Sequence, residues 1–313
     1  MSEPGLAVAP TAFGRFDIIS RIGKGGMCEV FKAQIRTGTR AGELVAVKRL
    51  LPEMSQNAEA VDMFLSEADV SRLLQHPNII EVIETGQVKD GQDESYYIAM
   101  QFVDGRDLGQ ILDRCRVRNI LLPVDFSVYL TSKLLEALDY AHNARSRSDH
   151  PLEIVHRDVS PGNIFVSRLG EVKLGDFGIA RMRSSSADET GVWGKPYYLA
   201  PEALTGEPVT PSTDLWAAAV ILYELLTDKR PFRGQTLDEL STQIQEAMPR
   251  SPRVLRPGLP DKLAQVTLTA LKGNASERYP TAGKFHEALA PFLDDRIGTP
   301  MAIASVVRGL FGG

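Results

Sequence analysis

The pattern of apolar residues changes once along the chain, near residue 103, and this change constrains the fold more than any other feature. Before it, short runs of β-branched and aromatic residues alternate with glycine-containing turns, which is typical of strands. After it, apolar residues recur every three or four positions, as in helices that bury one face. The sequence therefore predicts an α+β chain with a small sheet-based part followed by a larger, mainly helical part.

Five strands and one main helix are expected in the first part. The strand signals cover 16–23, 29–35, 43–51, 79–87 and 96–103. A helical spacing covers 57–75 and is stopped by His-Pro-Asn at 76–78. Four helical periods follow in the second part, at 125–144, 213–227, 236–248 and 260–273.

These signals divide the chain into four segments. Residues 1–14, rich in Pro, Gly and Ala, are expected to form a flexible leader, followed by the two parts at 15–103 and 104–293. The tail, 294–313, holds a cap-like Thr299 and apolar residues at helical spacing, which predicts an amphipathic helix. Such a helix packs onto the helical part or docks a partner, and the sequence leaves both open.

Composition excludes several classes of function. The 313 residues include 35 basic and 40 acidic ones, a net charge of −5, so no strong field would collect nucleic acid or an anionic membrane. Cys28 and Cys115 are too few for a disulfide framework or a cysteine-built zinc site. With no signal peptide and no run near the roughly 18 apolar residues of a membrane span, we expect a cytoplasmic protein without a membrane span.

Two segments of the first part carry candidate phosphate chemistry. The glycine turn GKGGMCEV (23–30) lies between two strands, where a bare hairpin turn is the simpler interpretation. The next strand, however, places Lys48 where an ammonium could reach phosphates, after Ala46, which is small enough to admit a flat base. Glu67 follows nineteen residues later on the helix and could hold Lys48 in a charge-assisted pair.

The loop HRDVSPGN (156–163) carries the candidate catalytic groups, a base-like Asp158 and a metal-binding Asn163. DFG (176–178) and APE (200–202) follow it. Together with the glycine turn, VAVK and Glu67, these motifs occur in the order of protein kinases. Over roughly residues 16–293 the chain resembles bacterial Ser/Thr protein kinases of the eukaryotic-like type.

The resemblance implies a bilobal fold with a small β-sheet N-lobe, one main helix in it, and a larger helical C-lobe. It implies transfer of the ATP γ-phosphate to protein Ser or Thr hydroxyls, with Mg²⁺. Asp158 would orient the acceptor hydroxyl, Asn163 and Asp176 would hold Mg²⁺, and Lys48, fixed by Glu67, would grip the α- and β-phosphates.

The remaining nucleotide contacts are also implied by the resemblance. The glycine turn would cover the phosphates, adenine would lie between Ala46 and Phe165, Met100 would be the gatekeeper, and Asp107 would meet the ribose. The full set assigned to nucleotide binding is Ile22, Gly23, Lys24, Gly25, Gly26, Val30, Ala46, Lys48, Glu67, Met100, Gln101, Val103, Asp107 and Phe165.

Two further matches have structural roles in the resemblance. Asp214 resembles a buried aspartate that braces the catalytic loop. Glu202 and Arg278 resemble an ion pair that ties the APE segment to the C-lobe. Removing one partner of such a buried pair leaves the other charge buried without its counter-charge, which destabilises the fold.

Three positions depart from the family's pattern: Cys28 at the third glycine of the turn, Ser160 where the catalytic loop carries Lys, and Lys195 where Thr commonly precedes Pro. In the family the last two positions both lie against the catalytic Asp. We therefore include Lys195 among the catalytic candidates, as the ammonium that position 160 lacks. The alternative is that Lys195 points to solvent or to an acidic substrate.

Regulation is expected through the segment after DFG. Arg157 would attract a phosphate on that segment, and Thr190 is the first candidate by position, ahead of Ser184, Ser185 and Ser186. A serine run is also typical of a loop without any modification. The partners expected are protein substrates and a second copy of the chain for autophosphorylation.

Two other functions stay open from the sequence. A pseudokinase, a nucleotide-binding scaffold that signals by conformation, is motivated by the three departures. A small-molecule phosphotransferase of related fold is the other, although the stretch from DFG to APE is typical of a platform for peptide substrates.

Overall fold

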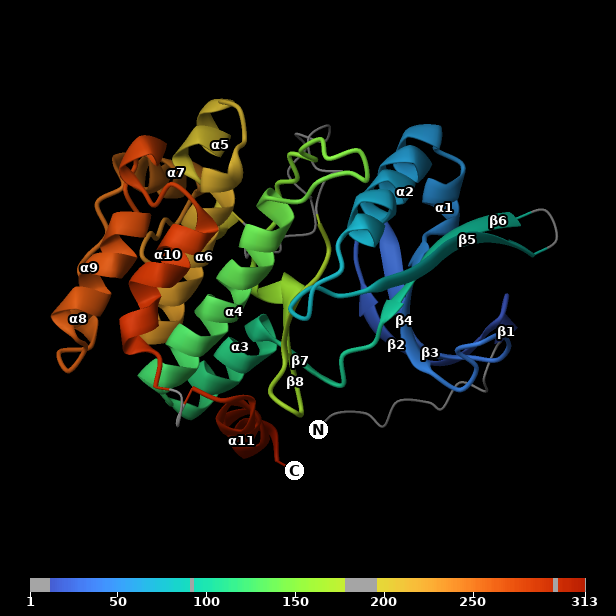
Figure 1. The fold of residues 1–313 in the computed structure, drawn as a ribbon, viewed down its shortest axis with the longest axis horizontal. Coiled ribbons are helices and arrows are strands. Elements are labelled where there is room, and N and C mark those ends of the chain that lie inside the picture. The colour runs from blue at the N-terminus through green and yellow to red at the C-terminus, as the bar shows by residue number, and fades with distance from the viewer. Residues whose placement is uncertain (1–11, 91–92, 178–195, 295–297, 313) are drawn as a thin grey trace. The chain divides into compact units, whose positions relative to one another are not determined.

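The computed structural model describes residues 12–90, 93–177, 196–294 and 298–312, which belong to two compact units (Figure 1). Of the described residues, unit 1 holds those up to 75 and 80–103. Unit 2 holds 76–79, 104–177 and those from 196 onward. One boundary between the units thus falls between Val103 and Asp104, where the sequence pattern changes.

Unit 1 is built on a six-stranded antiparallel sheet in the order β1-β2-β3-β4-β6-β5. Its strands are β1 (Ala12–Phe13), β2 (Phe16–Lys24), β3 (Cys28–Ile35), β4 (Leu44–Leu50), β5 (Val82–Asp90) and β6 (Asp93–Gln101). A short helix α1 (Pro52–Ser55) precedes the main helix α2 (Ala58–Leu73). Asn57 caps α2 by accepting hydrogen bonds from the amides of Glu59 and Ala60.

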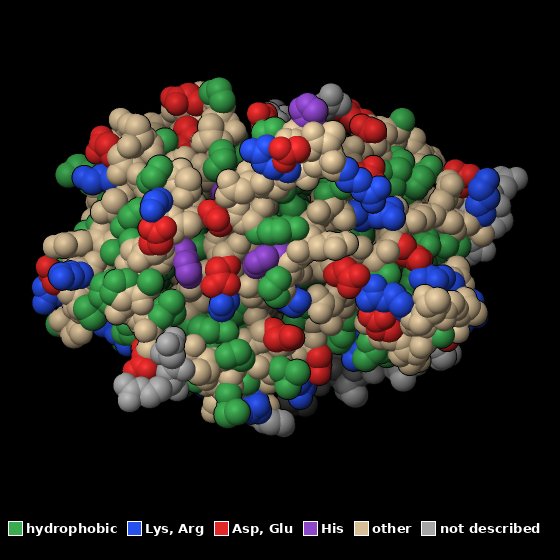
Figure 2. Space-filling view, in the orientation of Figure 1, with side chains coloured by type: hydrophobic (Ala, Val, Ile, Leu, Met, Phe, Trp, Pro, Cys, Tyr) green, Lys and Arg blue, Asp and Glu red, His purple; other side chains and the backbone are tan. Residues whose placement is uncertain are grey.

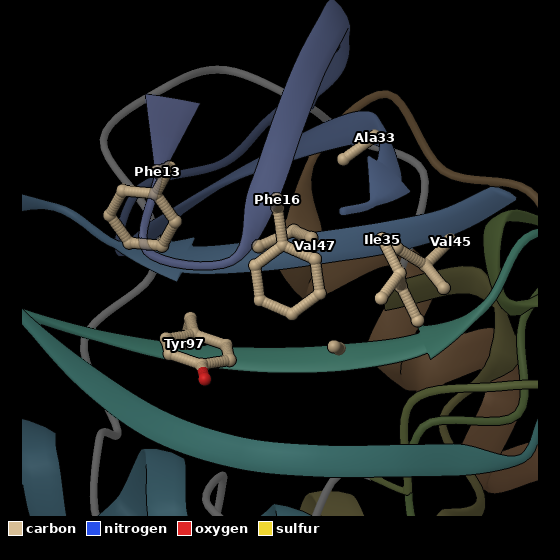
Figure 3. Close-up of a cluster of buried hydrophobic side chains, with 8 residues drawn as sticks. Phe13, Phe16, Ala33, Ile35, Val45, Val47 and Tyr97 are labelled. Carbon is tan, nitrogen blue, oxygen red and sulfur yellow. The ribbon is translucent and has the colours of Figure 1, made fainter. Parts of the chain in front are cut away.

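The two faces of this sheet bury different residues, as the period of two along a strand requires. Val45 and Val47 of β4 belong to a cluster that includes Phe13, Phe16 and Tyr97 (Figure 3). The alternate residue Leu50 belongs to a second cluster, with Phe64 and Ala68 of α2 and Ile98 of β6. Ala46 and Lys48 alternate with Val45 and Val47, so they lie on the face that α2 covers.

Strand β1 includes two residues of the segment 1–14 that was expected to form a flexible leader. Residues 1–11 of that segment lie outside the described residues. Its residue Phe13 is buried, and its ring meets the ring of Tyr97 edge-on, with centroids 5.7 Å apart. The ring of Phe16 meets the same tyrosine at 5.3 Å. We did not predict this two-residue strand because the segment is rich in Pro, Gly and Ala, but packing between aromatic rings stabilises it.

Unit 2 is mainly helical, as the spacing predicted. Its helices are α3 (Leu108–Arg118), α4 (Val124–His142), α5 (Pro201–Thr205), α6 (Pro211–Thr227), α7 (Leu237–Glu246), α8 (Pro252–Leu255), α9 (Asp261–Ala270), α10 (Ala282–Leu289) and α11 (Pro300–Phe311). All residues of α6 from Thr213 to Thr227 are buried, so this helix forms the centre of the unit. Helix α4 packs against both α6 and α10.

A small antiparallel sheet completes unit 2. It consists of β7 (Gly105–Asp107), β8 (Ile164–Ser167) and β9 (Val172–Leu174), in that order. The amide of Leu174 donates to the carbonyl of Asn78 at 2.8 Å, which ties the 76–79 segment to this sheet. We did not predict these strands, because three or four residues are too few to show a period.

Charged side chains of both signs are interspersed on the molecular face drawn in Figure 2. In the described part of the chain no helix is long and apolar enough to cross a bilayer.

The ion pair between Glu202 and Arg278 is confirmed and joins α5 to the segment before α10. The two guanidinium nitrogens of Arg278 each donate to one oxygen of Glu202, both at 2.8 Å. Burial alone would raise the pKa of the Glu202 carboxyl. The hydrogen bonds from Arg278, together with its charge, a backbone amide and the Thr213 hydroxyl, outweigh burial, so that pKa lies below its usual value of 4.5.

We predict that Glu202→Gln lowers the free energy of unfolding at neutral pH by about 3 kcal/mol, because Arg278 then keeps a buried charge without this carboxylate. A lowered folded-state pKa contributes stability above the unfolded-state pKa and loses it as the pH falls through the folded-state value. The difference from the wild type should therefore shrink below pH 4.5. Urea unfolding at several pH values measures it.

The matched control is Glu287→Gln, since Glu287 pairs with Lys284 on the surface, where its side chain is 64 % exposed. This substitution should change the stability little at any pH. Equal effects of the two substitutions at neutral pH would contradict the role given to the buried pair.

Candidate active site

In unit 1, Lys48 and Glu67 form the ion pair that the sequence predicted. Lys48 Nζ lies 2.7 Å from Glu67 Oε1, and both side chains are only 14 % exposed. The pair forms because Lys48 lies on the face of β4 that α2 covers and Glu67 lies within that helix. The carboxylate beside Lys48 offsets part of the cost of burying the ammonium.

Three more predicted residues accompany Lys48 on this face of the sheet. Val30 of β3 is directly opposite Lys48, and Met100 of β6 is directly opposite Ala46. Residues directly opposite each other share a face, and so do alternate residues of one strand. The sheet thus brings together Val30, Ala46, Lys48 and Met100, three apolar side chains and one ammonium.

The glycine turn is tight, and one of its amides is already used. The amide of Gly25 donates to the carbonyl of Cys28 at 2.7 Å, so it is committed within the turn rather than offered to a phosphate. A Cβ at Gly23 or Gly25 would meet nothing closer than 3.6 Å among the described residues. Packing inside the chain therefore does not explain these two glycines.

The flanking residues of the turn face outward. Ile22 is 49 % exposed, and the side chain of Lys24 is 60 % exposed, with its ammonium 3.9 Å from Glu29. At the end of β6, the amide of Gln101 donates to the carbonyl of Glu81 at 2.8 Å. Of the two backbone groups of Gln101, only the carbonyl could be offered to a base, and Val103 follows two residues later.

In unit 2, the catalytic loop brings Asp158 and Asn163 together. Asn163 Nδ2 donates to the Asp158 carbonyl at 2.8 Å and to Asp158 Oδ2 at 3.0 Å. Because the amide nitrogen points to Asp158, the amide oxygen is the end of Asn163 that could serve a metal ion. The backbone carbonyl of Asn163 accepts from the amide of Gly175 at 2.9 Å, which ties the loop to the residue before Asp176.

Asp214 braces this loop, as predicted, from the first turn of α6. Its carboxylate is 1 % exposed and accepts from the amides of His156 and Arg157, both at 2.8 Å. His142 Nε2 lies 2.8 Å from the same carboxylate. One buried charge thus holds three donors, two of which are backbone groups of the loop.

His156 connects the loop to the segment that carries Asp176. Its Nδ1 accepts from the amide of Asp158 at 3.2 Å, and its Nε2 lies 3.0 Å from the carbonyl of Gly175. These partners require the proton on Nε2. The ring also packs on Phe177, with centroids 4.5 Å apart. We predicted no role for His156, although it opens the loop motif 156–163, or for His142. Nothing in the sequence marked His142, which lies in α4.

Arg157 and Asp176 have backbones in the left-handed region, with φ of 66° and 53°. Residues other than glycine enter this region rarely, and such conformations are held by their surroundings at functional sites. The Asp214 carboxylate supplies that support for Arg157 through its amide. Arg157 Nε is buried, and no described residue accepts a hydrogen bond from it.

Asp107 and Phe165 lie at directly opposite positions of β7 and β8, so they share one face of the small sheet. Asp107 is also the N-cap of α3, because its Oδ1 accepts from the amide of Gln110 at 2.9 Å. Burial raises the pKa of the Asp107 carboxyl, against the effect of the amides that it accepts from. The aspartate predicted to meet the ribose therefore also starts a helix.

Three predicted positions need separate mention. Ser160 is 4 % exposed, and within the described ranges its Oγ has no hydrogen-bond partner. Lys195 and Thr190 lie outside the described residues.

The residues of unit 2 fit a magnesium ion only in part. No group of three or more His, Cys, Asp and Glu forms a metal cluster in the described residues. Asn163 and Asp176 offer one amide oxygen and one carboxylate, both hard oxygen donors. Mg²⁺ prefers six oxygens and commonly takes the rest from water and substrate phosphates, so this donor set suits a metal that arrives with a nucleotide.

A protein-family model identifies the family of the chain. Residues 16–289 match the model of the protein kinase domain. The chain belongs to the protein kinase family. The fold class expected from the sequence, a sheet-based N-lobe with one main helix and a larger helical C-lobe, is therefore confirmed.

Named relatives of this kinase are bacterial. It is 34 % identical over 317 residues to tyrosine-protein kinase MasK of Myxococcus xanthus, covering 100 % of this chain and 48 % of MasK. It is 33 % identical over 286 residues to serine/threonine-protein kinase PknA of Mycobacterium tuberculosis, covering 90 % of this chain and 62 % of PknA. The chain thus spans about half to three fifths of the length of these two relatives.

A solved structure gives the same answer for the fold. The kinase domain of PknI from Mycobacterium tuberculosis aligns with a TM-score of 0.67 at 27 % sequence identity. The alignment covers 91 % of this kinase and 98 % of that domain.

We predict that Asp214→Asn lowers the free energy of unfolding by about 3 kcal/mol, because an amide cannot accept from three donors and adds a donor of its own among them. It should also reduce any activity that depends on the loop. Urea unfolding measures the first effect. Asp149→Asn, at a side chain that is 85 % exposed, is the control and should change little; an equal loss there would contradict the bracing role.

Proposed function

We propose that this chain is an active protein kinase that transfers the γ-phosphate of ATP to Ser or Thr hydroxyls of proteins, itself included. The arrangement of Asp158 and Asn163 carries this proposal. The Asn163 amide nitrogen donates to the backbone carbonyl and to Oδ2 of Asp158, which holds the candidate base and a candidate metal ligand beside each other. A scaffold that only binds nucleotide would also use the Lys48–Glu67 pair, so the pair supports nucleotide binding and the Asp158–Asn163 arrangement supports transfer.

Each residue contributes one task to the transfer. Asp158 orients the acceptor hydroxyl and accepts its proton as the oxygen attacks phosphorus. Lys48, held by Glu67, would bind the α- and β-phosphates, and Asn163 and Asp176 would hold magnesium. When bound, magnesium supplies charge that offsets the charge developing on the transferred group.

Nucleotide binding is assigned to residues that share faces of the two sheets. Ala46, Val30 and Met100 offer apolar contact beside Lys48, while Phe165 and Asp107 share a face of the small sheet. Glycines 23 and 25 fit this role, since packing inside the chain does not require them. A phosphate that approaches the backbone closely would require them.

The class of acceptor hydroxyl, Ser or Thr against Tyr, is inferred from the relatives and from the loop 156–163. PknA is named a serine/threonine kinase and MasK a tyrosine kinase, and their identities to this chain differ by one percentage point. The loop 156–163 lacks the Ala/Arg pattern that resembles tyrosine kinases. We therefore propose Ser or Thr as the acceptor.

The setting of the proposed activity follows from its chemistry. ATP as co-substrate and a chain with only two cysteines, Cys28 and Cys115, are consistent with a reducing cytoplasm. Autophosphorylation would require a second copy of the chain as substrate. Arg157, whose Nε has no acceptor among the described residues, is the proposed contact for a phosphate on Thr190 or a nearby serine.

We predict that the chain transfers labelled phosphate from Mg-ATP to itself and to a generic protein acceptor. Asp158→Asn should lower the rate roughly 10² to 10⁴-fold, the range for removal of a general base. The control Asp149→Asn should leave the rate unchanged. Acid hydrolysis of the product should give phosphoserine and phosphothreonine, and mass spectrometry should find phosphate between residues 182 and 194.

The other functions predict different results. Nucleotide binding without transfer identifies a pseudokinase, and transfer to small molecules but not to protein identifies a small-molecule phosphotransferase. Phosphotyrosine as the main product would overturn the acceptor class alone. An unmodified 182–194 segment would overturn autoactivation there.

We also propose that Lys195 supplies the ammonium that position 160 lacks. Ser160 supports this idea, because its buried Oγ has no described hydrogen-bond partner and a serine cannot offset charge near Asp158. In that case Lys195→Ala should slow transfer about tenfold or more in the wild type and much less in a Ser160→Lys background. Initial rates of the four proteins in this cycle measure the coupling. Equal slowing in both backgrounds would show that the positions act independently.

A further inference from the structure

Helix α11 lies outside the residues that match the kinase family model, yet it is an integral part of unit 2. Thr299 caps it by accepting from the amide of Ala302. It packs against α3 and β8, as Figure 1 shows for unit 2. Its buried face is formed by Ile303, Ala304, Val307 and Leu310. Of the two roles left open by the sequence, packing onto the helical part is therefore the one observed.

Two arginines of α3 hold the end of α11. Arg114 Nε donates to the carbonyl of Leu310 and Arg118 Nη1 to that of Gly309, both at 3.0 Å. The last carbonyls of a helix lack partners within it and carry partial negative charge. The arginines lie four residues apart, so they share a face of α3 and cap α11 from outside.

The start of α11 is held as closely. Gly170, in the turn between β8 and β9, has φ of 83°, and a Cβ there would lie 1.7 Å from the carbonyl oxygen of Pro300. The helix therefore rests directly on the backbone of this turn. Near the other end, the guanidinium of Arg106 in β7 lies 5.0 Å from the centre of the Phe311 ring.

Helix α11 contacts α3 and β8, and these elements carry or adjoin two residues proposed to bind the nucleotide, Asp107 and Phe165. Asp107 ends β7 and caps α3, and Phe165 lies opposite it on β8. Helix α3 has only eleven residues, and isolated helices of this length are marginal in water. Its position, and with it the position of Asp107, must come from tertiary contacts, of which the arginine bonds to α11 are two.

We infer that α11 positions the ribose and adenine contacts of the kinase, with Arg114 and Arg118 as positioning residues that act through α3 on Asp107. This inference rests on the proposed function for the identity of the ligand. Neither arginine touches the candidate catalytic residues in any described contact. Their effect should therefore fall on the affinity for the nucleotide and not on the chemical step.

The test replaces both arginines, Arg114→Ala with Arg118→Ala. The KM for ATP should rise about threefold to tenfold, the effect of losing an ordinary hydrogen bond. The dissociation constant for Mg-ADP should rise equally, while kcat and the KM for the protein acceptor stay within about twofold. A loss of folded protein lowers the apparent kcat but leaves KM unchanged, so a structural defect gives the opposite pattern.

The control removes two exposed arginines that lie outside α3 and α11, Arg147→Ala with Arg253→Ala, for the same change in charge. If control and test proteins have the same KM for ATP and the same affinity for Mg-ADP, the inference is wrong.

Phe311→Ala, which removes the ring beside Arg106, decides the question if the double variant does not fold. It should raise both the KM for ATP and the dissociation constant for Mg-ADP.

The readout by Mg-ADP separates this inference from the proposed function. A wild-type chain that binds Mg-ADP without transferring phosphate overturns the kinase activity, and the comparison of affinities still decides the role of α11. A wild-type chain that binds neither ATP nor Mg-ADP overturns both.

Discussion

The buried carboxylate of Asp214 is the interaction on which the rest of the candidate site depends. A charge that is 1 % exposed is tolerable only because three donors surround it, and two of these are backbone amides of the catalytic loop. If the loop changed its conformation, its two amides would leave the carboxylate and the charge would be buried without these donors, so the buried charge favours the observed loop conformation. The left-handed backbone of Arg157 and the neighbouring bonds of Asp158 and Asn163 follow from that anchor.

Sequence reasoning succeeded where the period of a pattern or a motif was long. Helices α4, α7 and α9 were predicted because each buries one stripe over ten or more residues. Helix α6, which is buried from Thr213 to Thr227, was predicted because its apolar residues run almost without interruption. The α3 helix was missed, although its buried residues Leu108, Ile111, Leu112 and Cys115 recur at helical spacing, because this spacing covers only positions 108–115. The small sheet and β1 were missed because two to four residues carry no period.

For the candidate site, motifs identified residues but not their partners. The Lys48–Glu67 pair and the role of Asp214 could be predicted, because motif order places these side chains in a known frame. The commitment of the Gly25 amide within the turn could not, nor could the capping role of Asp107. Both depend on backbone geometry, which residue types at fixed spacing do not specify. The same holds for the buried hydroxyl of Ser160, which has no hydrogen-bond partner among the described residues.

The contact between Gly170 and Pro300 has a consequence for comparing relatives. Any side chain at 170 would occupy the space of the Pro300 carbonyl, so an ortholog with alanine there cannot seat an equivalent helix without moving the β8–β9 turn. The residue at this one position thus becomes a marker, readable in any alignment. It should sort bacterial kinases into those whose segment after the catalytic domain is built into the C-lobe and those in which it begins as an independent linker.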